Sequence, residues 1–83
     1  MRMHLLSIKK IHELGLKELE GDKLDDFGYY RWWNLQKNDC EIAITYEYNN
    51  DNKITNAYVE FNGFPLKGKL ITLEEIETLI KIM

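Results

Sequence analysis

A chain of 83 residues with 45% hydrophobic and 30% charged side chains has the composition of one globular domain and not of a disordered segment. Its net charge of −3 excludes a global basic field for nucleic acid, and its single cysteine excludes an internal disulfide. The sequence shows neither an apolar run of membrane-spanning length nor the features of a signal peptide. We therefore expect a single domain over residues 1–83, cytoplasmic and not associated with a membrane.

The first elements are a short helix and a weak strand. Ser7 is a typical N-cap, and the pattern after it predicts a helix from Ile8 to Leu14 that ends at Gly15. Leu16 to Glu20 is a weak strand candidate, because its alternation defines no clear buried face, and its charges suit a sheet edge. An acidic loop, Gly21 to Asp26, follows.

Alternating residues then predict the body of a sheet. Phe27 to Gln36 forms one strand, Cys40 to Tyr48 the next, and Ile54 to Phe61 the third, with an Asn-rich turn before the last. Simple alternation would place Ile54 on the opposite sheet face from the other apolar residues of its strand that are expected to be buried. Either a β-bulge near Thr55–Asn56 restores the phase, or Ile54 lies outside the buried zone. Asn62-Gly63 is a dipeptide that tolerates positive φ at both turn positions.

The clearest helix start lies near the end of the chain. Phe64-Pro65 begins a connector, because proline cannot donate to an interior ladder. Thr72 caps the helix, Glu75 completes a capping box, and Ile71 with Ile76 forms a hydrophobic staple. The apolar residues at helical spacing are Leu73, Ile76, Leu79, Ile80 and Met83.

These elements predict an α+β domain with a short N-terminal helix, a three- to four-stranded antiparallel sheet and a C-terminal helix. The simplest packing places both helices on one sheet face. Strand parity predicts the buried face as Trp33, Leu35, Ile42, Ile44, Tyr46, Ala57, Val59 and Phe61. The opposite face then presents Tyr30, Trp32, Thr45, Glu47, Tyr58 and Glu60.

The sequence offers little for catalysis or cofactor binding. His4, His12 and Cys40 are dispersed and match no zinc motif, so we expect no metal and no cofactor. A Cys40–His12 pair has no local motif behind it, and the Asp22, Asp25 and Asp26 cluster is typical of a solvated loop. We expect the protein not to be an enzyme.

The aromatic face is the best candidate for function. Tyr30, Trp32 and Tyr58, accompanied by Glu47 and Glu60, resemble an interface core with a polar rim, and acidic groups favour a protein partner with a basic surface. Alternatively, Tyr30 and Trp32 pack under the acidic loop or against a second copy, which would make the protein a regulatory or structural homodimer instead of a monomer.

A small RNA-binding domain is a further alternative, because sheet aromatics can stack bases. The basic residues that such a site needs are few, and Arg31 is predicted to point away from Trp32. Direct nucleic-acid binding is therefore not the favoured interpretation.

In size, in acidity and in its preference for lysine, asparagine and isoleucine, the chain resembles the small inhibitors that phages and other mobile elements make against host defence nucleases, the anti-CRISPR proteins in particular. The resemblance concerns type and covers no specific residues. It implies an acidic protein that evades host defence by binding the basic guide-RNA or nucleic-acid channel of a nucleoprotein nuclease, without chemistry of its own.

Overall fold

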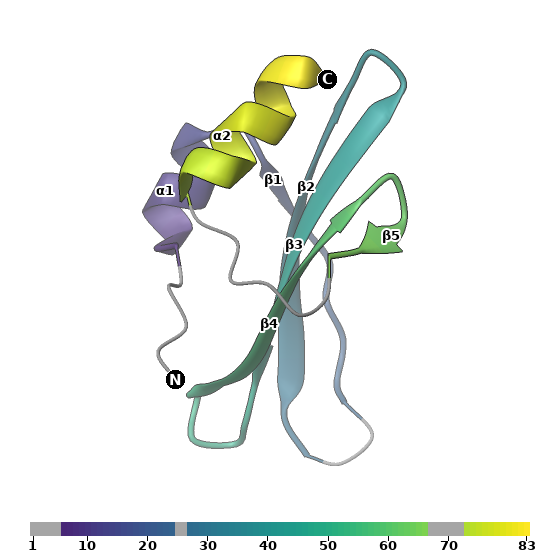
Figure 1. Ribbon diagram of the computed structural model, residues 1–83. Helices are drawn as coiled ribbons and strands as arrows, with labels where there is room; N and C mark the ends of the chain where they lie inside the picture. The colour runs from purple at the N-terminus through teal and green to yellow at the C-terminus, as the bar shows by residue number, and fades with distance from the viewer. Residues whose placement is uncertain (1–5, 25–26, 67–72) are drawn as a thin grey trace.

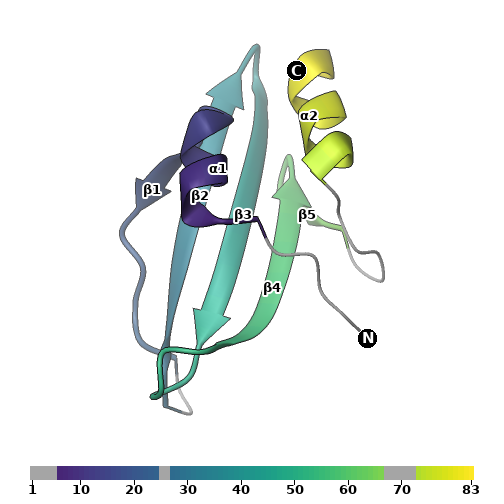
Figure 2. The same ribbon diagram turned by 90° about the vertical axis from the view of Figure 1, so that its left-hand side faces the viewer.

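The computed structural model describes residues 6–24, 27–66 and 73–83. Along the chain these residues form α1 (Ile8–Glu13), β1 (Lys17–Leu19), β2 (Tyr29–Lys37), β3 (Cys40–Tyr48), β4 (Ile54–Phe61), β5 (Phe64–Pro65) and α2 (Leu73–Ile82). Every neighbouring strand pair is antiparallel, in the order β1-β2-β3-β4-β5. Both helices lie on one side of the sheet (Figures 1 and 2). The predicted α+β architecture is confirmed.

The sheet has five strands, and not the three or four predicted, because the short strand β5 extends it beyond β4. The weak strand candidate Leu16 to Glu20, whose strand character the sequence left open, forms the edge strand β1 over Lys17–Leu19. The prediction that Phe64-Pro65 begins a connector was wrong, since these residues pair with Phe61 and Glu60 as β5. Proline is tolerated there because β5 is an edge strand, where a missing N–H interrupts no interior ladder.

Turn chemistry sets the register of the central strands. Asn38 and Asp39 have φ of 51° and 64°, and Asn62 and Gly63 have φ of 51° and 83°, so each pair joins its strands with positive φ at both turn positions. Of the two explanations for the parity of Ile54, the bulge is the one that the structure shows. Glu47 pairs with Asn56 and Tyr48 pairs with Ile54, which leaves Thr55 unpaired and returns Ile54 to the face that the helices cover.

Phe27 corrects the predicted start of the second long strand. β2 begins at Tyr29, because Phe27 and Gly28 have φ of 82° and 104°, which no strand accommodates. The Phe27 side chain is 82% exposed and does not pack on the strand face to which alternation had assigned it. Gly28 passes so close to the Tyr48 carbonyl oxygen that a Cβ at this position would clash.

The core lies between the helices and the face predicted to be buried. Trp33, Ile42 and Ile44 are at most 2% exposed, and Ile11 of α1 and Ile76 of α2 pack into the same cluster. Leu35, Ala57 and Phe61 are partly buried against it. The remaining predicted members, Tyr46 and Val59, are buried as well. The predicted assignment of this face is therefore confirmed.

The N-terminal helix is capped as predicted. The Ser7 hydroxyl accepts a hydrogen bond from the Lys10 amide at 3.1 Å. The helix ends one residue earlier than predicted, at Glu13, with Leu14 as the C-cap and Gly15 at φ 98°. For the second helix, Ile76 and Met83 of the predicted stripe are buried, whereas the predicted Thr72 cap and Ile71 staple lie outside the described residues.

Candidate protein-binding face

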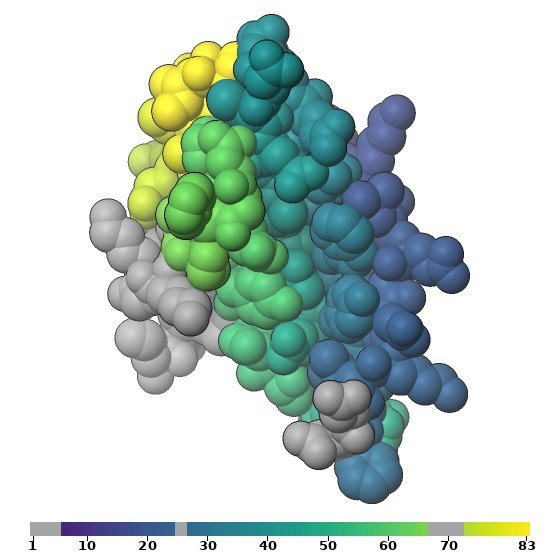
Figure 3. Space-filling model, turned by 90° about the vertical axis from the view of Figure 1, so that its right-hand side faces the viewer, coloured from purple at the N-terminus to yellow at the C-terminus, as the bar shows by residue number. Residues whose placement is uncertain are grey.

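The strand register gathers all the predicted binding residues on the sheet face that neither described helix covers (Figure 3). We call it the open face. Within the three long strands its residues are Tyr30, Trp32, Asn34 and Gln36 of β2, Glu41, Ala43, Thr45 and Glu47 of β3, and Asn56, Tyr58 and Glu60 of β4. The predicted site residues therefore share one surface.

Thr45 lies at the centre of the aromatic part of this face. It pairs with Trp32 on one side and with Tyr58 on the other. Although no described helix covers it, Thr45 is only 5% exposed, because the larger side chains on the flanking strands shield it. Burial raises the pKa of the Tyr58 phenol, an interaction with Thr45 opposes the rise, and the charges of Glu47 and Glu60 add to it.

Trp32 is held at the edge of this aromatic region. Its indole Nε1 donates a hydrogen bond to the Glu20 carbonyl oxygen at 3.0 Å, and its side chain is only partly exposed. In the same segment, the Asp22 carbonyl oxygen accepts a hydrogen bond from the Tyr30 amide at 3.0 Å. The segment after β1 therefore fixes the Trp32 ring, and the expected free access to this side chain is reduced.

Carboxylates surround the aromatic residues. Tyr30 pairs directly with Glu47, and Glu60 follows Tyr58 by two positions on the same face of β4. Among the described residues, Lys17 on the β1 edge is the cation whose register position shares this face. The open face is therefore aromatic and acidic, which is the chemistry expected for contact with a basic surface.

Two further residues contribute to this face, and of these Leu19 was not predicted. Leu19 pairs with Trp32, is 37% exposed and extends the apolar area toward β1. Glu41 accepts hydrogen bonds from the side-chain amides of Asn34 and Gln36, at 3.1 and 2.9 Å. The alternation of β3 predicted this position of Glu41. Alternation could assign no clear face to Leu19, because β1 contains only three residues.

Arg31 lies on the covered face, as strand alternation predicted. Its guanidinium donates to both carboxylate oxygens of Glu18, each at 2.8 Å, and lies 5.2 Å from the centre of the Trp33 ring. The hydrogen bonds from Arg31 hold the pKa of Glu18 below its ordinary value. This arginine is therefore engaged within the fold and does not contribute a cation to the open face.

The described residues show no geometry that supports a metal site. Within the described ranges, no group of three His, Cys, Asp or Glu side chains could hold a metal ion. The Asn49 side chain accepts hydrogen bonds from the Asp51 and Lys53 amides, at 2.9 and 3.0 Å, so the Asn-rich segment is a closed turn. Asp25, Asp26 and His4 lie outside the described residues.

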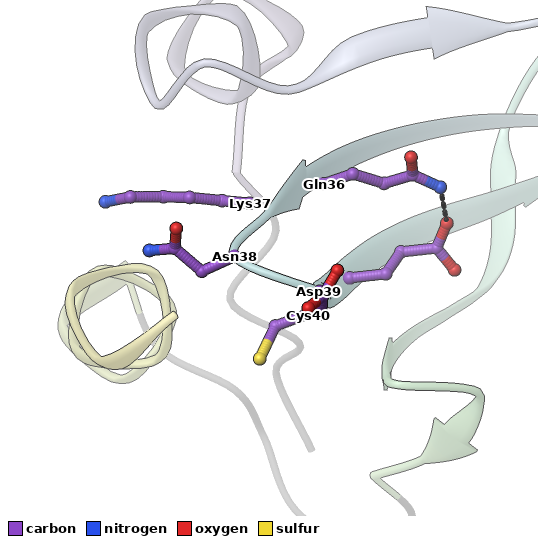
Figure 4. Close-up of a pocket in the computed structure, with 6 residues that line it drawn as sticks. Gln36, Lys37, Asn38, Asp39 and Cys40 are labelled. Atoms are coloured by element: carbon purple, nitrogen blue, oxygen red, sulfur yellow. Dashed lines mark hydrogen bonds between the residues drawn. The ribbon is translucent and has the colours of Figure 1, made fainter.

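A shallow hollow lies at the β2–β3 turn (Figure 4), lined by Gln36, Lys37, Asn38, Asp39, Cys40 and Glu41. Asn38 donates to the Met83 carbonyl at 2.8 Å and so ties this turn to the end of the chain. No hydrogen bond joins Cys40 to His12 in the part of the chain that the structure describes. Because one hairpin supplies the whole lining, we assign no reaction to the hollow.

Comparison of the chain with protein-family models, curated proteins and solved structures found no match. In the described part of the chain, neither helix is long and apolar enough to cross a membrane. The interpretation of function therefore depends on the open face itself.

Proposed function

We propose that the protein is a non-enzymatic binding module that docks its open face on a basic surface of a protein partner. The observation that carries this proposal is the position of Tyr30, Trp32 and Tyr58 beside Glu47 and Glu60 on a face that neither described helix covers. Aromatic side chains supply the apolar contact area of such interfaces, and rim carboxylates steer a basic partner into place.

The same charges argue against the alternatives. RNA bases could stack on the aromatic rings, but the RNA phosphates would then approach Glu47 and Glu60. A symmetric homodimer through this face would bring the same carboxylates of two copies toward one another. A basic partner would lower the negative potential at the open face, whereas RNA or a second copy of the chain would raise it.

The resemblance to anti-CRISPR proteins supplies the first partner to test. The nucleic-acid channel of a CRISPR nuclease is a strongly basic surface, and an acidic, aromatic face suits it. In this proposal the protein occupies that channel and thereby blocks the guide-RNA complex from reaching DNA. Inhibition then requires no catalytic residue and no cofactor.

The test measures binding of the protein to purified Cas9-type nucleases, with and without guide RNA, together with cleavage of a matched DNA target. Replacing Glu47→Gln and Glu60→Gln together should weaken binding and inhibition by about tenfold or more, because two steering charges disappear from the interface. The matched control, Glu74→Gln with Glu77→Gln, removes the same charge from α2 on the other side of the sheet and should behave as the wild type.

Equal loss in the two double variants would show that net charge, and not the open face, drives binding. Sedimentation equilibrium of the free protein tests the homodimer alternative. A dimer that Trp32→Ala dissociates would contradict the proposal, because the open face would then be occupied by a second copy. Tight binding of single-stranded RNA that depends on Tyr58 would favour the RNA-binding alternative.

A further inference from the structure

The covered face of this sheet already contains a guanidinium site. Glu18 and Trp33 are direct cross-strand partners in β1 and β2. Arg31 binds both oxygens of Glu18 at 2.8 Å while its guanidinium lies 5.2 Å from the Trp33 ring centre. A carboxylate beside an aromatic ring on neighbouring strands therefore binds arginine in this fold, through a bidentate ion pair and a cation–π contact.

The open face repeats this cross-strand combination once, without the arginine, and adds a second carboxylate beside a ring within a single strand. Tyr30 and Glu47 are direct cross-strand partners in β2 and β3, and Tyr58 and Glu60 are neighbours on one face of β4. Glu47 makes one long contact, 3.5 Å, with the Asn56 amide. The Glu60 side chain forms no hydrogen bond or ion pair with another residue that the structure describes. Both carboxylates can therefore accept further hydrogen bonds, and each lies beside an aromatic ring.

Both carboxylates also act on one ring. Burial is the main cause of the raised pKa of Tyr58, and Glu47 and Glu60 each add to it, which places the phenol within electrostatic reach of both. Thr45 pairs with Tyr58 and is shielded beneath the aromatic side chains, so the rings form a filled surface and not an open slot. A flat cation can stack on such a surface.

We propose that the open face recognises arginine side chains of an extended basic segment, an inference that rests on the proposed function and specifies its partner. Glu47 pairs with Asn56, which is four positions before Glu60 on β4, so the two carboxylates are separated by about 13 Å along the strand. That separation matches two arginines four residues apart in an extended segment. Arginine suits the site better than lysine, because its planar guanidinium can stack on Tyr30 or Tyr58 while it pairs with the neighbouring carboxylate.

The test uses fluorescein-labelled synthetic peptides with two arginines four residues apart in a Gly-Ser background, and the same peptides with lysine in place of arginine. Fluorescence anisotropy at low salt should give an affinity for the arginine peptide about tenfold higher than for the lysine peptide. Glu47→Gln with Glu60→Gln should abolish this binding, and Glu74→Gln with Glu77→Gln should not. Tyr58→Leu, which keeps every charge, should remove the preference for arginine, and Tyr58→Phe should preserve it.

The outcomes separate this inference from the proposed function. Equal affinity for the two peptides, still dependent on Glu47 and Glu60, would overturn arginine recognition and leave a generally basic partner in place. Absence of binding to either peptide would also overturn the inference, while the nuclease assay continues to test the function independently. Far-ultraviolet circular dichroism of each variant establishes that a lost affinity does not reflect a lost fold.

Discussion

Trp32 and Trp33 are consecutive in β2, yet they lie on opposite faces of the sheet and in opposite environments. Trp33 is completely buried, and its indole N–H has no hydrogen-bond partner among the described residues, so packing and the contact with Arg31 hold its side chain. Trp32 is partly exposed and donates to the Glu20 carbonyl at 3.0 Å. Two consecutive residues of one strand thus place one indole in the core and the other on the open face.

This difference predicts unequal effects on stability. Trp33→Ala should cost about 3–5 kcal/mol of unfolding free energy, because it leaves a large cavity in the core. Trp32→Ala should cost about 1–2 kcal/mol, since it loses one hydrogen bond and a partly buried ring. Urea unfolding of both variants gives the comparison. Equal shifts of the two urea midpoints would show that Trp32 belongs to the core and not to the open face.

The Glu18–Arg31 pair predicts a specific pH dependence of stability. Because the pKa of Glu18 is lowered from its ordinary value of 4.5 in the folded protein, its contribution is complete well above pH 4.5 and is lost as the pH falls through the lowered value. The side chains are 35% and 34% exposed, so the pair contributes at most about 1 kcal/mol.

The measurement for this pair is the difference in unfolding free energy between the wild type and Glu18→Gln. The difference should be present at neutral pH and absent in strong acid, where Glu18 is protonated and resembles glutamine. Glu13→Gln removes an exposed carboxylate whose ion pair with Lys10 is longer, 3.5 Å, and serves as the control with a smaller effect. A difference that persists unchanged in acid would show that packing, and not charge, explains the Glu18 effect.

Two glycines at positive φ should respond differently to alanine. Gly63 has open space where a Cβ would lie, so Gly63→Ala should cost about 1 kcal/mol through backbone strain alone. Gly28→Ala adds a clash with the Tyr48 carbonyl to the same strain and should cost more than about 2 kcal/mol. Thermal melts of the two variants test this order. A larger effect at Gly63 would contradict the close approach at Gly28.

The sequence alone determined the faces of the long strands. Alternation placed Trp33, Ile42 and Ile44 in the core and Tyr30, Trp32 and Tyr58 on the opposite face, because successive side chains of a strand point to opposite sides whatever their partners are. The Asn62-Gly63 turn followed from local backbone chemistry in the same way. The parity of Ile54 left open a bulge or a strand end, and the structure shows the bulge at Thr55. These features depend on near neighbours in the chain.

The tertiary structure decided what depends on distant residues. The short strands β1 and β5 have too few residues to define a period, and they exist because β2 and β4 offer them unpaired edges. Phe27 leaves its expected strand because Gly28 must pass against Tyr48. The hydrogen bond that limits the exposure of Trp32 has as its acceptor the carbonyl oxygen of Glu20, twelve residues earlier, and only the folded chain brings this carbonyl to the indole.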